Sequence, residues 1–140
     1  MLWVIIILFG KNDDMKRIYI SILFLVLAFI GASVELGYVN AKTDFFISLI
    51  EQADEYIEKE KYNDAFTLCN EMEEKWKDSS KTIDMMLNHE PIDSVGVNFA
   101  KMSSYIKNGR FDLYYSESIS AKKELAYIKE SESLNTENIL

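Results

Sequence analysis

His89 is the only histidine of the chain, and two carboxylates stand close to it in the segment His89-Glu90-Pro91-Ile92-Asp93. A histidine with a glutamate beside it and an acidic residue one helical turn further on is similar to the metal-binding helix of zinc proteases. Pro91 favours a helix boundary here, so that His89 and Asp93 need not share a helix face, and a second histidine is absent. The competing interpretation places Asp93 in the first turn of a helix, with His89 or Glu90 as a cap. We favour capping, and we predict no catalytic residue, metal or cofactor.

No other group of residues in the sequence predicts catalysis. A glycine-rich phosphate loop, a Gly-x-Gly motif and a nucleophile elbow are all missing, and the single cysteine, Cys69, is expected to be buried. The acidic runs 51–60 and 71–74 lack the Asp-x-Asp-x-Gly pattern of calcium loops, so we expect solvated helix faces. Trp76 is a candidate anchor for a partner, although its place in an apolar stripe is more typical of a core residue. The interaction candidates are Trp76, His89, Glu90 and Asp93.

Helices must position these residues, because apolar side chains beyond residue 40 recur every three or four positions and do not alternate. Gly109 allows the left-handed backbone that ends one of these helices. Five helices are predicted: about 44–60 with Thr43 or Asp44 as N-cap, from Asn63 or Asp64 through Trp76, from Ser79 or Ser80 to Asn88, from Pro91 to Asn108, and from Phe111 to Glu130. The sequence therefore predicts an all-α fold, a compact antiparallel bundle of about five helices made of two hairpins and a short connecting helix.

An internal echo supports the two hairpins. The pattern Tyr56-Ile57-x4-Tyr62-Asn63 returns 49 residues later as Tyr105-Ile106-x4-Phe111-Asp112. In each copy, an aromatic residue just after a tight turn would staple the two helices of the hairpin. A peptide-binding groove is the functional alternative, and we favour core formation.

The uncharged run from Ile18 to Val34 predicts a transmembrane helix that contacts the lipid bilayer. As a helix it would be about 26 Å long, which suits a hydrocarbon core of about 30 Å when the flanking side chains snorkel. Lys16 and Arg17 precede the run and Glu35 follows it. This asymmetry predicts a single-pass protein of the cell membrane, with a cytoplasmic N-terminus and an extracytoplasmic C-terminal domain.

Two features of the N-terminal region leave alternatives open. Small residues at Gly31, Ala32 and Ser33 fit a cleaved signal peptide and a secreted product, but the apolar run is longer than a usual signal core, so we prefer an anchor. The first 14 residues hold an apolar run too short to span a membrane and then two acids, so our hypothesis is that translation starts at Met15. We therefore divide the chain into an upstream extension (1–14), a signal-anchor helix with flanks (15–40), a helical domain (41–130) and a polar tail (131–140).

The charge of the chain excludes one class of partner. The formal net charge is −8, and the excess of acidic side chains lies in residues 41–140. An acidic surface repels phosphate backbones, so we predict no nucleic-acid binding.

The order of several short motifs resembles a known family. These motifs are Met15-Lys16-Arg17 before a single span, Trp76, the segment from Asn88 to Asp93, Tyr105-Ile106, and Glu137-Asn138-Ile139-Leu140. Together they resemble the uncharacterised single-span family known as domain of unknown function 4363. The resemblance implies a membrane-tethered helical domain of Gram-positive, often spore-forming bacteria, and it supplies no catalytic residue.

We therefore predict a membrane-anchored, extracytoplasmic interaction or scaffolding module of the cell or spore envelope that is not an enzyme. Its partner is expected to be another membrane protein, because Gly31 and Ala32 would let a neighbouring helix approach closely. The alternative is a ligand sensor or metal-assisted hydrolase centred on His89, Glu90 and Asp93.

Overall fold

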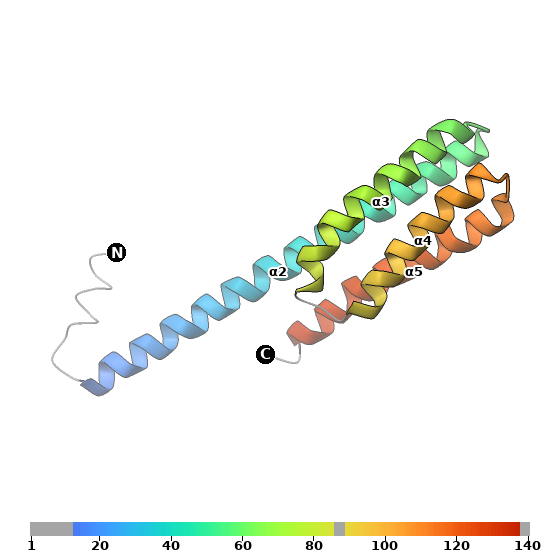
Figure 1. Cartoon of the computed structure of the whole chain (residues 1–140). Coiled ribbons are helices and arrows are strands. Elements are labelled where there is room, and N and C mark those ends of the chain that lie inside the picture. The colour runs from blue at the N-terminus through green and yellow to red at the C-terminus, as the bar shows by residue number, and fades with distance from the viewer. Residues whose placement is uncertain (1–12, 86–88, 138–140) are drawn as a thin grey trace. The chain divides into compact units, whose positions relative to one another are not determined.

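The computed structural model describes residues 13–85 and 89–137, with side chains for 15–85 and 90–131 (Figure 1). Within these residues every regular element is an α-helix, which confirms the all-α prediction. The helices are α2 (Asp13–Glu58), α3 (Tyr62–Asp84), α4 (His89–Lys107) and α5 (Phe111–Glu137). The chain forms two compact units, residues 1–37 and residues 38–140.

In the first unit, the apolar side chains of α2 are exposed. Phe24 is 67% exposed, Leu25 71% and Val34 67%. By length and composition α2 is able to cross a membrane, a criterion that a signal sequence near the N-terminus also meets. The predicted extension 1–14 lies almost wholly outside the described residues.

The prediction of about five helices in the bundle is wrong, because the expected short third helix is part of α3. Ser79 is 8% exposed and lies on the buried face of α3, and the Ser80 hydroxyl donates to the Lys77 carbonyl at 3.2 Å. A serine that bonds back to the preceding turn can stay inside a helix, so neither serine starts a new one.

The expected N-cap at Thr43 or Asp44 is also wrong, since both residues lie inside α2. The Thr43 hydroxyl bonds the carbonyls of Val39 and Asn40, each at 3.0 Å, as a helix-interior threonine does. At the other end of the chain, α5 continues past Glu130 to Glu137, because no glycine or proline stops it.

Two turns of the same geometry build the predicted hairpins. After α4, Gly109 has φ +66°, its N–H donates to Ile106 O at 3.1 Å, and Arg110 N–H donates to Tyr105 O at 2.9 Å. After α2, Glu60 has φ +57° and makes the first of these bonds at 3.0 Å, and Lys61 makes the second at 2.8 Å. Each pair of bonds is the Schellman motif that ends a helix. The repeated sequence pattern therefore corresponds to a repeated turn structure.

The core of the second unit lies between these hairpins. Phe46 of α2 packs edge-on against Trp76 of α3, with ring centroids 5.1 Å apart, and stacks on Phe99 of α4 at 5.8 Å. Leu125 of α5 is also fully buried. Each helix thus contributes to one shared apolar core.

Candidate polar site in the bundle

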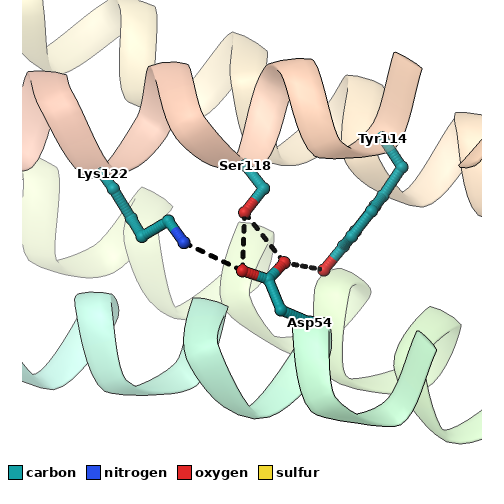
Figure 2. A network of polar contacts seen from close by, with 4 residues as sticks. All are labelled: Asp54, Tyr114, Ser118 and Lys122. Atoms are coloured by element: carbon teal, nitrogen blue, oxygen red, sulfur yellow. Dashed lines mark hydrogen bonds and ion pairs between the residues drawn. The ribbon is translucent and has the colours of Figure 1, made fainter. Parts of the chain in front are cut away.

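The densest polar cluster in the described part of the bundle is centred on the carboxylate of Asp54 in α2 (Figure 2). Tyr114 donates its hydroxyl to Oδ1 at 2.9 Å. The Ser118 hydroxyl lies 2.8 Å from Oδ1 and 3.0 Å from Oδ2, and the Lys122 ammonium lies 2.9 Å from Oδ2. Three donors from α5 therefore converge on one carboxylate of α2.

The three donors share one face of α5 because they are spaced four residues apart. Tyr114 and Ser118 are fully buried, whereas the side chain of Asp54 is 17% exposed and that of Lys122 is 32% exposed. The cluster thus runs from the core towards the surface and ends on a cation that reaches water. A partly buried carboxylate is stabilised by such donors, because they replace the hydrogen bonds to water that burial removes.

Burial raises the pKa of two weakly acidic groups here, the Cys69 thiol beside the cluster and the Tyr114 hydroxyl within it. Desolvation, followed by the negative charge of Asp54, raises the pKa of the Cys69 thiol to about 12. Desolvation also raises the pKa of Tyr114, and Cys69 and Asp54 add to that shift. The thiolate is the reactive form of cysteine, so a fully buried, protonated Cys69 is a poor nucleophile.

His89 and Asp93 lie on one helix, which differs from the expectation that Pro91 separates them. Helix α4 begins at His89, so Pro91 lies within its first turn, where a missing N–H is tolerated. Both residues are therefore on one helix, four positions apart, and the expected boundary between them is wrong. The side chain of His89 lies outside the described residues.

Glu90 lines an open depression of about 340 Å³ together with Pro91, Ser94, Glu124 and Tyr127. Asp93 is exposed on the same helix. Among the described residues, no three His, Cys, Asp or Glu side chains are grouped so that they could hold a metal ion.

Trp76 lies in the core, where it is 2% exposed. Its indole N–H donates to the carbonyl of Ile92 in α4 at 3.1 Å, and its ring lies edge-on to Phe46 and Phe99. A tryptophan held in this way is not available at the surface.

Asp54 was missed because it lies in the acidic run 51–60, which the sequence suggested was a solvated face. One signal separates it from its neighbours. It stands four residues after Ile50 and three before Ile57, both buried, so it faces the same side of α2 as the apolar stripe.

Comparison with known proteins gives one match. A model of the family described as "Domain of unknown function (DUF4363)" matches residues 34–139, which is most of the chain. No curated protein and no solved structure matches.

Proposed function

The chain belongs to the family of domain of unknown function DUF4363, and we propose that it acts as a membrane-anchored, extracytoplasmic interaction module of the cell envelope. The observation that carries this proposal is the exposed apolar surface of α2 between Ile18 and Val34. In water this surface would drive aggregation, whereas in a bilayer it is matched by lipid.

The charge pattern supports the orientation. Lys16 and Arg17 stand at the start of the apolar run, and basic residues are retained on the cytoplasmic side. The acidic domain follows on the other side of the run.

The bundle supports a binding role more than a catalytic one. The Asp54 carboxylate accepts hydrogen bonds from three internal donors, which leaves it little capacity to bind a substrate. Cys69 is buried and protonated. Binding of a partner at the protein surface is therefore the activity that these features support.

Crosslinking followed by co-purification from native membranes tests the proposal. We expect a consistent membrane-protein partner, and we expect Gly31→Leu to weaken its recovery if the partner packs on the membrane helix. A Cβ at Gly31 would meet no atom within 4 Å, so this change leaves the fold intact. Recovery of no consistent partner would contradict the proposal.

A second candidate is a ligand sensor or metal-assisted hydrolase at His89, Glu90 and Asp93. The common helix of His89 and Asp93 and the depression beside Glu90 favour it. His89→Ala decides between the two: metal content, stability and biological activity stay unchanged for an interaction module, and metal content and activity fall for a metal site.

A further inference from the structure

The two hairpins are equivalent well beyond their turns. Shifting the numbering by 49 residues superimposes the buried positions of α2 and α3 on those of α4 and α5. The equivalent buried pairs are Phe46 and Val95, Ile50 and Phe99, Ala53 and Met102, Ile57 and Ile106, Ala65 and Tyr114, Cys69 and Ser118, Met72 and Ala121, and Trp76 and Leu125. Residues 43–79 and 92–128 are therefore two versions of one structural unit.

The side-chain volumes of the two versions are complementary. At three equivalent buried positions one hairpin carries alanine and the other a large residue: Ala53 is equivalent to Met102, Ala65 to Tyr114, and Ala121 to Met72. Equivalent residues share a layer of the bundle, since both turns lie at the same end and their aromatic rings stack. In these three layers two unlike hairpins supply one large and one small side chain, whereas two copies of one hairpin would leave a cavity or a clash.

The polar side chains also differ between the two versions. Asp54 is equivalent to Ser103, whose hydroxyl donates to the Ala100 carbonyl of its own helix at 3.0 Å. The donors Tyr114, Ser118 and Lys122 are equivalent to Ala65, Cys69 and Glu73. The interface of α2 with α5 thus holds a carboxylate and its donors. At the equivalent interface of α3 with α4, the three donor positions are occupied by Ala65, Cys69 and Glu73.

We infer that Asp54 is the pairing determinant of the bundle: it makes the α2–α3 hairpin selective for the α4–α5 hairpin and unsuited to a second copy of itself. In a like pair, Asp54 would face Ala65 and Cys69, which carry no positive charge to balance a partly buried carboxylate. One polar group that fixes the partner of a helix is a well-established device in helical assemblies. The inference goes beyond the proposed function, because it states which internal surfaces of the domain can pair.

Moving the carboxylate to its equivalent position tests this inference in the full chain in detergent. Ser103→Asp places a carboxylate opposite Ala65 and Cys69, and we expect the folding equilibrium constant to fall at least a hundredfold. Ser104→Asp is the matched control, because it adds the same charge to the exposed neighbouring position, and we expect a change of a few-fold at most.

Supplying the missing cation completes the test. Glu73→Lys recreates the equivalent of Lys122. In the Ser103→Asp background we expect it to raise the folding equilibrium constant at least tenfold. By itself, Glu73→Lys should change stability only a few-fold. Denaturant unfolding of the four chains measures the coupling. If Ser103→Asp behaves like Ser104→Asp, or if Glu73→Lys gives no recovery, the inference is overturned. Neither outcome depends on whether an external partner exists.

Discussion

The ring of Tyr62 stacks on the ring of Phe111, with centroids 4.5 Å apart and planes inclined by 21°. Each residue opens the second helix of its hairpin, so the contact joins the two hairpins, although the echo in the sequence suggested that each ring would staple its own hairpin.

This stack should be measurable as a coupling between the hairpins. In a double-mutant cycle with Tyr62→Ala and Phe111→Ala, we expect a coupling energy of about 0.5–1.5 kcal/mol, the usual range for aromatic pairs. Denaturant unfolding of the four chains gives the value. A coupling energy indistinguishable from zero would show that the two turns are independent.

Glu60 and Gly109 occupy the same left-handed position in the two turns, but only glycine does so without a steric penalty. We therefore expect Glu60→Gly to stabilise the domain by about 1 kcal/mol and Gly109→Ala to destabilise it by about 1 kcal/mol. Glu60→Ala is the control for the lost charge, because it keeps the Cβ and should change stability much less. Equal effects of Glu60→Gly and Glu60→Ala would rule out backbone strain as the cause.

Two ion pairs join the same helices, α2 and α5, and differ in burial and in the hydroxyls of Tyr114 and Ser118, which bond Asp54 alone of the two carboxylates among the described residues. Asp54–Lys122 lies at 2.9 Å with exposed fractions of 17% and 32%, and Asp44–Lys129 lies at 2.7 Å with 59% and 41%. We expect Asp54→Ala to cost about 2–4 kcal/mol of unfolding free energy, because it orphans two buried hydroxyls and a cation. Asp44→Ala should cost about 1 kcal/mol or less, as exposed pairs do. Similar losses for both variants would contradict the role given to the buried cluster.

Alkaline pH should weaken the domain through Cys69. Its folded pKa is about 12, above the ordinary value of 9.0, so the unfolded chain loses this proton first as the pH rises. The stability from the protonated thiol is complete below pH 9 and is lost between pH 9 and about 12. Each pH unit in that window costs up to about 1.4 kcal/mol for one proton. In a plot of unfolding free energy against pH, Cys69→Ala should reduce the slope in this window by the contribution of one proton. An unchanged slope would show that the thiol is not involved.

Periodicity was enough to predict the class of fold, the two hairpins and the cap at Gly109, because apolar spacing and a left-handed glycine act locally. It was not enough for the helix boundaries. Thr43 and Ser79 are good caps by residue type, yet both are buried in continuous helices, where packing outweighs capping preference.

The polar cluster could be predicted only in part. Tyr114, Ser118 and Lys122 line up by spacing, but their common acceptor is on a helix some 60 residues earlier in the chain. No local pattern encodes such a pairing. The stripe position of Asp54 was the available clue, and the surrounding acidic residues concealed it.

The most direct test of the central claim is to label the bundle from outside the cell. Met85 is 82% exposed at the end of α3, and Cys69 is buried, so Met85→Cys provides one accessible thiol. With a membrane-impermeant maleimide on intact cells, we expect the variant to be labelled without permeabilisation, the unchanged chain to stay unlabelled, and the labelled protein to remain with the membrane. Labelling that requires permeabilisation, or a labelled product free in the medium, would contradict an anchored domain outside the cell.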